Sequence, residues 1–271
     1  MFHPTGSTSP EDRLSIMKIL IFFVLCCIQQ VTGSWKQSPP APQHKSEVDW
    51  FPVDCQDIWD IRRPPSGVYI IYPQGAQRPL PVYCDMTSGG MVWTVFQRRL
   101  DGSVRFDQPW QDYVNGFGNA DGEYWLGLQN IYRLTVCGEY ELRVELEDLE
   151  GTRVSAQYMN FSLSRHALNP DSDGYWLHVG AFIGGGAGDA LSPHSGNMFS
   201  TYDKDQDGHP QNCAEYWGGG FWYHPWGCGE AGLNARYNTT NPLQPAFSWT
   251  TWVDFPQTLS RSEMKMRKIL P

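Results

Sequence analysis

Positive charge is scarce in this sequence, and so is charge of either sign. Lys and Arg total 20 against 29 Asp and Glu, giving a formal net charge of −9, and charged residues are 18% of the 271 residues. So few cations argue against a nucleic-acid partner, because binding a phosphate backbone requires clustered Lys and Arg. Low charge combined with 14% aromatic residues also argues against intrinsic disorder.

Long apolar runs are lacking too, and the one candidate is residues 19–28, ILIFFVLCCI. This run is too short to cross a bilayer, which takes about 20 residues, so we predict no membrane span. Lys18 precedes the run, and residues 31–33 after it include the small residues that cleavage requires. This arrangement predicts a secretory signal peptide over residues 1–33, with translation starting at the first methionine or at Met17. We therefore expect a secreted protein of the extracellular space or matrix.

Metal-binding cysteine patterns are absent. No Cys-x-x-Cys pair and no Cys/His quartet with zinc spacing occurs, so a zinc site is not expected. Signal-peptide cleavage would remove two of the seven cysteines, and the remaining odd number leaves one over if the others pair in an oxidising compartment. Two sequons predict glycosylation of a secreted chain at Asn160 and Asn238.

Catalytic motifs are absent as well. The sequence contains neither Gly-x-Ser-x-Gly nor His-Glu-x-x-His. Glu145 and Glu147 alternate with apolar residues, so they are better explained as solvated strand residues than as the carboxylate pair of a glycosidase. We therefore predict that the protein is not an enzyme.

The chain divides into a linker and one domain. Residues 34–48 are polar and rich in proline, which is typical of a linker or tail. No second linker follows, so residues 49–271 are expected to form a single domain. No internal repeat or heptad stretch occurs. A homo-oligomer is compatible with the sequence, although no coiled coil predicts one.

Several stretches alternate apolar with polar residues, as strands with one buried face do. In residues 140–147, Tyr, Leu, Val and Leu alternate with charged residues that should face water, and 154–163 is the expected partner strand. Further strands are expected at 67–72, 80–84 and 91–98, the first two as a hairpin. Short helices are expected at 110–114 and 124–134. The Gly-rich chain from 184 onward should be mostly loop, and loops that long are usually functional.

Three carboxylates stand at alternate positions before a glycine, at Asp203, Asp205 and Asp207. Alternate spacing in a turning loop lets carboxylates converge on a hard cation such as calcium. An EF-hand is excluded, because its twelfth position, counted from Asp203, is Ala214 and not a bidentate Glu. The spacing alone leaves a different kind of calcium loop and a solvated acidic turn equally open.

Six segments in chain order carry a family resemblance: YCDM at 83–86, WTVFQRR at 93–99, DGEYWLGL at 121–128, FSTYD at 199–203, NCA at 212–214 and EMKMR at 263–267. The chain resembles the fibrinogen C-terminal domain family over residues 54–268. The resemblance implies an α+β fold with an antiparallel sheet, short helices and a long, loop-rich subdomain that binds calcium and ligand.

The resemblance also implies two disulfides. One would join Cys55 to Cys84 beside the first hairpin, and the other would join Cys213 to Cys228 after the acidic loop. Cys137 has no partner in the family pattern. It is expected to be a buried thiol on a strand edge or, alternatively, an intermolecular link.

The calcium site implied by the resemblance uses four oxygen ligands. Two are the side chains of Asp205 and Asp207, and two are the backbone carbonyls of His209 and Gln211. Asp203 would contribute its charge and not a bond. Calcium is the one cofactor expected.

Family members bind acetylated sugars or peptides in a pocket with aromatic walls and a His directly after the second Cys. This sequence departs from that pattern, because Gly229 follows Cys228 and residues 224–227 are inserted. Trp217 and Phe221 are the candidate aromatic walls, His224 is the candidate replacement for the missing His, and Leu243 falls near the position where the family places a Tyr. A core position is the better explanation for Phe221, and for Trp217 the two explanations are equally good.

The resemblance points to a secreted, calcium-binding recognition glycoprotein. Its expected partners are extracellular matrix proteins, with microfibril association and a role in cell adhesion. The alternative is a soluble innate-immune lectin that binds acetylated glycans.

Overall fold

The computed structural model describes residues 50–75, 78–237, 246–253 and 258–269. The predicted signal peptide and linker lie outside these residues, as do Asn238 and Leu243. In the described part, no helix combines the length and the apolar character that a membrane span requires. Trp50–Pro271 forms one compact unit.

The elements are short. The helices are α2 (Cys55–Arg62), α3 (Trp110–Asn115), α4 (Leu128–Thr135), α5 (Pro170–Asp173) and α6 (Cys213–Trp217), with single 3-10 turns at Ser88–Gly90 and Ser192–His194. The longer strands are β1 (Gly67–Ile71), β2 (Leu80–Asp85), β3 (Trp93–Arg99), β6 (Tyr140–Asp148), β7 (Arg153–Tyr158) and β13 (Leu259–Lys268). The shorter strands are β4 (Phe117–Gly118), β5 (Tyr124–Trp125), β8 (Ser162–Leu163), β9 (Leu177–His178), β10 (Phe182–Gly184), β11 (Ala231–Gly232) and β12 (Ser248–Trp249).

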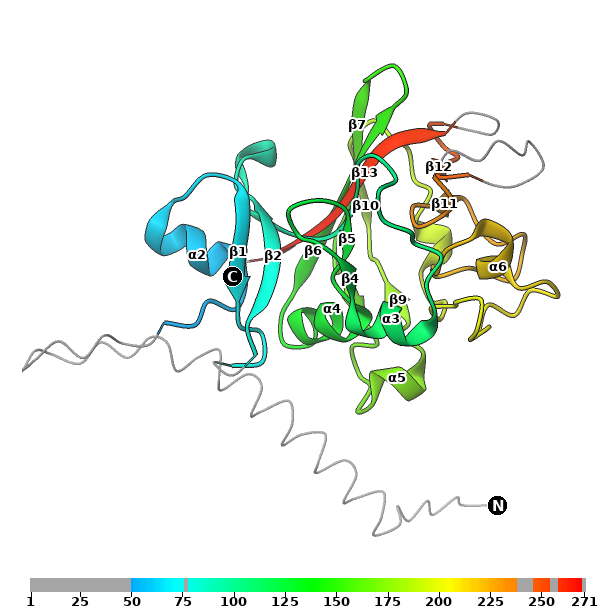
Figure 1. Ribbon diagram of the computed structural model, residues 1–271, viewed down its shortest axis with the longest axis horizontal. Coiled ribbons are helices and arrows are strands. Elements are labelled where there is room, and N and C mark those ends of the chain that lie inside the picture. The colour runs from blue at the N-terminus through cyan, green and yellow to red at the C-terminus, as the bar shows by residue number, and fades with distance from the viewer. Residues whose placement is uncertain (1–49, 76–77, 238–245, 254–257, 270–271) are drawn as a thin grey trace, which may run out of the picture. The chain divides into compact units, whose positions relative to one another are not determined.

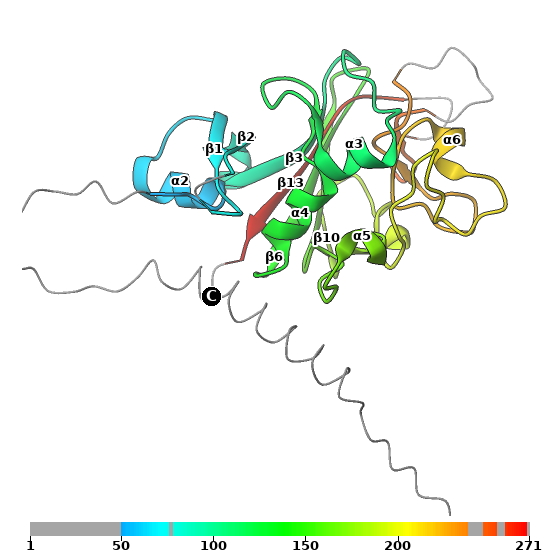
Figure 2. The same cartoon turned by 60° about the horizontal axis from the view of Figure 1, so that its bottom comes forward.

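A nine-stranded antiparallel sheet organises the described residues. Its order is β1-β2-β3-β13-β6-β7-β10, and β5 pairs with both β3 and β4. The last strand, β13, therefore lies in the middle, between β3 and β6. Figure 1 shows β13 running between the β1–β2 hairpin on one side and the β6–β7 hairpin on the other. Helices α3 and α4 lie together against one face of the sheet (Figure 2). The expected α+β fold is confirmed.

The predicted hairpins are confirmed, with two corrections to their neighbours. β1 pairs with β2 and β6 pairs with β7, as the alternating patterns indicate. The partner strand ends at Tyr158, however, because Asn160 has a left-handed backbone with φ of 52°. The helix expected over 124–134 begins only at Leu128, because Tyr124 and Trp125 form a strand against β3.

The second face of β6 is not simply solvated, which corrects the expectation for its charged residues. Glu141 is only 3% exposed and forms an ion pair with Arg267 of β13. The ammonium group of Lys265, also on β13, is fully buried on this face. The outer face of β6 therefore carries paired charges, some of them buried.

Lys265 is the centre of that ionic cluster. Its Nζ lies 2.6 Å from Asp85 Oδ2, 2.8 Å from Glu145 Oε2 and 3.6 Å from Glu263 Oε2, and it donates to Ser88 Oγ at 3.1 Å. Burial alone would raise the pKa of Asp85, but the Lys265 ammonium outweighs it and holds that pKa well below its usual range. The cluster ties β2, β6 and β13 together.

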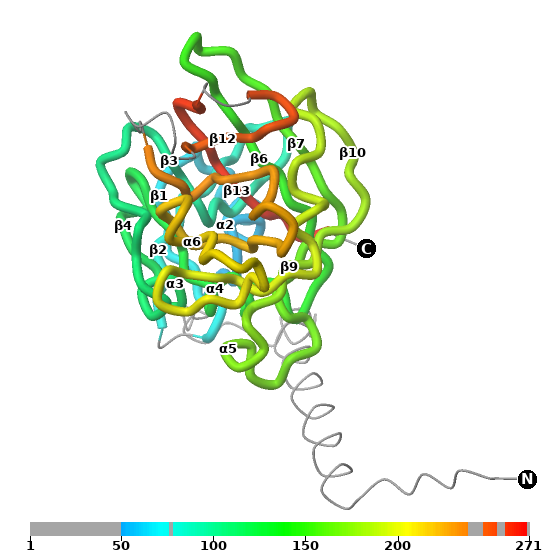
Figure 3. Tube along the Cα trace, turned by 90° about the vertical axis from the view of Figure 1, so that its right-hand side faces the viewer, coloured from blue at the N-terminus to red at the C-terminus, as the bar shows by residue number. Residues whose placement is uncertain are grey.

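Aromatic side chains pack the loop-rich part against the sheet and helices. The ring of Phe199 lies 5.0 Å from that of Tyr113, 5.8 Å from that of Trp125 and 5.0 Å from that of Trp222, between ring centroids. These four residues come from α3, β5 and two loops. Figure 3 shows the loop-rich segments around α6 and β12 lying in front of the central strands.

Replacing Lys265 with Met should destabilise the fold strongly. The variant keeps the length of the side chain but leaves three carboxylates without their shared cation, which we expect to cost about 3–5 kcal/mol of unfolding free energy. Urea denaturation measures this loss. Arg153→Gln removes a largely exposed ion pair with Glu147 and should cost under about 1 kcal/mol. Similar losses in the two variants would contradict a central role for Lys265.

Candidate functional site

The loop between Phe199 and Cys213 is held by one buried carboxylate. Asp207 is 3% exposed. Its Oδ1 accepts the N–H of His209 at 2.8 Å, and its Oδ2 accepts the N–H of Cys213 at 3.0 Å. Both oxygens therefore fix the backbone that leads into α6.

Asp205 lies next to Asp207 but is exposed. Its Oδ1 accepts the N–H of Asp207 at 3.3 Å. Burial raises the pKa of Asp207; the N–H groups of Cys213 and His209 lower it, and the like charge of Asp205 raises it again, for a net increase. A buried carboxylate whose pKa is raised beside a second carboxylate is a suitable place for a divalent cation.

Two carbonyl groups complete the predicted ligand set. In the described part of the chain, no backbone N–H donates to the carbonyl oxygen of His209 or of Gln211. The Nδ1 atom of His209 lies 2.9 Å from the Gln211 oxygen, so the two residues are neighbours. Carboxylate and carbonyl oxygens form the all-oxygen donor set that calcium prefers. The residues present therefore fit a calcium ion.

Asp203 has a different role from its two neighbours. Its Oδ1 accepts the N–H of Trp110 at 2.8 Å and the hydroxyl of Thr201 at 2.7 Å. It therefore fastens the acidic loop to the first residue of α3.

Both expected disulfides are present, Cys55–Cys84 and Cys213–Cys228. Cys137 is half-buried in the turn between α4 and β6. The expected position on a strand edge is therefore wrong.

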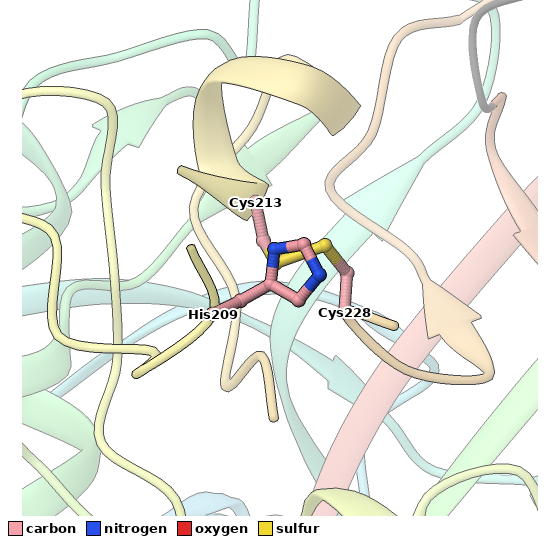
Figure 4. A group of neighbouring side chains, drawn as sticks. All are labelled: His209, Cys213 and Cys228. Atoms are coloured by element: carbon pink, nitrogen blue, oxygen red, sulfur yellow. A yellow bond between two sulfur atoms is a disulfide. The ribbon is translucent and has the colours of Figure 1, made fainter. Parts of the chain in front are cut away.

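The ring of His209 stands beside the Cys213–Cys228 disulfide, as Figure 4 shows. A disulfide sulfur is not a thiolate, so this group does not form a zinc site. The carboxylates of Asp85, Glu145 and Glu263 also lie together, but the ammonium of Lys265 already occupies the space among them.

The aromatic residues expected to wall a ligand pocket are mostly interior. Phe221 is fully buried and contacts the ring of Trp222, which agrees with its alternative as a core residue. Trp217 is 7% exposed, and its ring packs so closely on Gly232 that a Cβ there would lie 2.2 Å from it. Neither ring offers a broad face to a ligand.

The inserted segment forms a tight, closed loop. The N–H of His224 donates to the carbonyl of Cys228 at 3.3 Å, and the N–H of Trp226 donates to Nδ1 of His224 at 3.0 Å. The disulfide anchors the end of this loop, and Pro225 lies next to Gly208 of the acidic loop. Trp226 is 85% exposed, the most exposed of the large hydrophobic residues described. The sequence shows the insertion, but it gave no sign that Trp226 is exposed.

A histidine does stand beside the position after the second Cys, but it comes from elsewhere in the chain. A Cβ on Gly229 would lie 2.1 Å from Cε1 of His194, so His194 occupies the space that a side chain at 229 would need. His224, the predicted replacement, is half-buried with its ring centroid 5.7 Å from that of His194. No motif in the sequence indicated this role for His194.

The hydrogen bonds of His194 determine its protonation state. It is fully buried. Nδ1 lies 2.8 Å from the carbonyl oxygen of Trp222, and Nε2 accepts the N–H groups of Glu230 and Ala231 at 3.0 and 3.1 Å. This network assigns the proton of the neutral ring to Nδ1. Burial lowers the pKa of His194 to about 4.

The family model "Fibrinogen beta and gamma chains, C-terminal globular domain" matches residues 51–269. The chain is 50% identical to mouse microfibril-associated glycoprotein 4 over 219 residues, covering 80% of this chain and 84% of the relative. It is 40% identical to human fibrinogen C domain-containing protein 1 over 217 residues, covering 79% of this chain and 46% of the relative.

Solved structures share the fold. The fibrinogen-like globe domain of human ANGPTL2 matches with a TM-score of 0.72 and 38% identity, covering 80% of this chain and 99% of that one. Lamprey fibrin D-dimer, solved with the peptide ligand Gly-His-Arg-Pro-amide, matches with a TM-score of 0.72 and 30% identity, covering 96% of this chain and 89% of that one.

His194 should make the stability of the domain depend on pH. The ordinary pKa is 6.5 and the folded one about 4, so the unfolded chain binds this proton first as pH falls. The contribution of neutral His194 to the unfolding free energy is fully present above the pKa of the unfolded chain. It falls by up to about 3 kcal/mol as the pH drops toward the pKa of the folded protein. Urea denaturation of His194→Gln across this range should show lower stability at neutral pH but a smaller loss on acidification.

The exposed residue His178 provides the matched control, because it lies outside the buried network. His178→Gln should keep the pH dependence of the wild type. An unchanged pH dependence in His194→Gln would show that His194 is not a buried neutral group.

Proposed function

This chain belongs to the family of fibrinogen C-terminal globular domains, and from that membership we propose that it is a secreted, calcium-stabilised recognition glycoprotein of the extracellular matrix. The observation that carries the proposal is the all-oxygen ligand set of Asp205, Asp207 and the carbonyls of His209 and Gln211. The name of the relative microfibril-associated glycoprotein 4 supports association with microfibrils and a role in cell adhesion. Glycosylation at Asn160 is supported by its exposure.

The proposed role of calcium is structural, to stabilise the acidic loop. When bound, it would neutralise Asp205 and Asp207, whose proximity disfavours ionisation of the buried carboxylate. The loop that it stabilises continues into α6 and the Cys213–Cys228 disulfide. The ion would therefore stabilise the surface that includes the inserted loop and Trp226.

The second candidate function is a soluble lectin for acetylated glycans. It is favoured by Trp226, because an exposed indole face beside the acidic loop can stack on a sugar ring. Gly229 counts against it, because the His that family pockets place there would overlap His194. Matrix recognition therefore remains the leading proposal.

Calcium binding is tested by Asp205→Ala. The variant should have a lower melting temperature in calcium, by roughly 5–10 °C at saturating ion, and an unchanged one in EDTA. Asp203→Ala is the matched control, because its carboxylate binds Trp110 and Thr201. It should lower the melting temperature equally in calcium and in EDTA. Equal shifts for Asp205→Ala in the two conditions would refute a bound ion.

Recognition is tested by binding to two immobilised probes, isolated microfibrils and acetylated agarose. The wild type should bind microfibrils in calcium and be released by EDTA, and Trp226→Ala should weaken binding about tenfold. Leu149→Ala removes another exposed apolar side chain, 65% exposed, and should leave binding unchanged. Retention on acetylated agarose alone would favour the lectin. Binding to neither probe would reject both functions.

A further inference from the structure

A second concave site lies away from the acidic loop. It is a cavity of about 410 Å³ between the end of β3, the loop that follows it, and the chain near residue 236. Its lining includes three arginines, Arg99, Arg105 and Arg236, against one carboxylate, Asp107. A local excess of positive charge is unexpected in a chain with a net charge of −9.

Arg99 is buried at the base of this site with donors to spare. It is 1% exposed, and its guanidinium lies over the ring of Phe106, 4.0 Å from the centroid. Within the described residues, both of its hydrogen bonds use Nη1, which donates to the carbonyls of Leu233 and Ala235. A guanidinium has five N–H donors, and the one on Nε of Arg99 is buried without a hydrogen-bond acceptor among the described residues.

The nearest carboxylate, that of Glu123, is too far away to accept a hydrogen bond from Nε of Arg99. Glu123 Oε1 lies 3.9 Å from Arg99 Nε, which is an ion pair but exceeds hydrogen-bond distance. That oxygen already accepts the N–H groups of Leu100 and Gly102, at 2.7 and 2.9 Å. Glu123 thus organises the loop after β3 and leaves the guanidinium of Arg99 without a hydrogen-bonded anion.

Arg236 is fixed at the cavity wall by backbone groups. Its Nη1 donates to the carbonyl of Tyr216 at 2.6 Å, and its Nη2 donates to that of Glu215 at 3.0 Å. A Cβ on Gly218 would lie 2.5 Å from Cζ of Arg236, so glycine is required for this approach. Among the described residues, the partners that hold the charge of Arg236 are therefore backbone carbonyls and not carboxylates.

Arg105 supplies an exposed cation to the lining of the cavity. Its side chain is 83% exposed, and its Nη2 lies 4.0 Å from Asp107 Oδ2. An ion pair this long and exposed is weak, so the side chain is free to turn to another anion.

We propose that this cavity binds a carboxylate or sulfate group of an extracellular ligand, with Arg99 as the buried donor and Arg105 closing over the anion. Oxyanions match the planar donor array of guanidinium groups. The site goes beyond the proposed calcium-dependent recognition and should operate without calcium, because none of its residues belongs to the acidic loop.

The test titrates the full domain with sodium sulfate and, separately, sodium acetate at constant ionic strength in EDTA. The side-chain Nε–H signal of Arg99, observed by ¹⁵N-¹H NMR, should shift in a saturable manner. Titrations with glucuronate and with glutamate then distinguish an acidic sugar from an acidic side chain as the source of the anion.

Two matched variants assign the effect to the cavity. Arg105→Gln should weaken sulfate binding roughly fivefold, as expected for loss of one charged donor. Arg153→Gln removes an arginine of similar exposure, 73%, on β7, and should leave binding unchanged. Arg99→Lys should abolish the saturable shift, and its folding is checked by the remaining backbone spectrum.

The outcomes separate this proposal from the proposed function. A linear, non-saturating shift, or equal weakening by Arg105→Gln and Arg153→Gln, would mean that only water and bulk ions satisfy Arg99, and would overturn the anion site. Such a result would leave the calcium and microfibril experiments unaffected, because those depend on the acidic loop and on Trp226.

Discussion

The pairing of β13 with both β3 and β6 is the constraint on which the rest of the fold depends. The sheet is not complete until β13 is in place, because this strand lies between β3 and β6 and pairs with both. Lys265 on this strand adds a buried ionic contact to β2 and β6. Contacts between strands so distant in sequence form late and slowly, so we infer that docking of β13 completes the framework that the loops need.

The loop-rich part is stabilised by several separate contacts, not by regular structure. Phe199 packs its ring against Tyr113 and Trp222, Asp203 fastens the loop to α3, and the Cys213–Cys228 disulfide holds the inserted segment. None of these contacts uses the carboxylate of Asp205 or Asp207. The proposed calcium ion would therefore act on a pair of like charges that these contacts leave close together.

The sequence predicted those strands in which burial of one apolar face alone determines the order of the residues. Alternation over β6 follows from burial of a single face, so its apolar set was found, although the ion pairs of Glu141 and Glu145 were not. β13 was missed as a strand because its buried residues include Lys265, whose burial depends on carboxylates from β2 and β6. The disulfides came from family resemblance. Trp226 could not be recognised as an exposed site, because exposure is a tertiary property.

The environment of His194 explains why the ligand pocket cannot follow the family pattern. His194 supports the backbone at Glu230 and Ala231 through Nε2, and its ring fills the space next to Gly229. A His side chain at 229 and the ring of His194 in this position exclude each other. The imidazole of His194 is neutral, and both of its nitrogens are already hydrogen-bonded. The other distinctive feature of this region is the inserted loop, which exposes Trp226. The exposed indole of Trp226, and not a histidine after Cys228, is therefore the group that the proposed recognition would use.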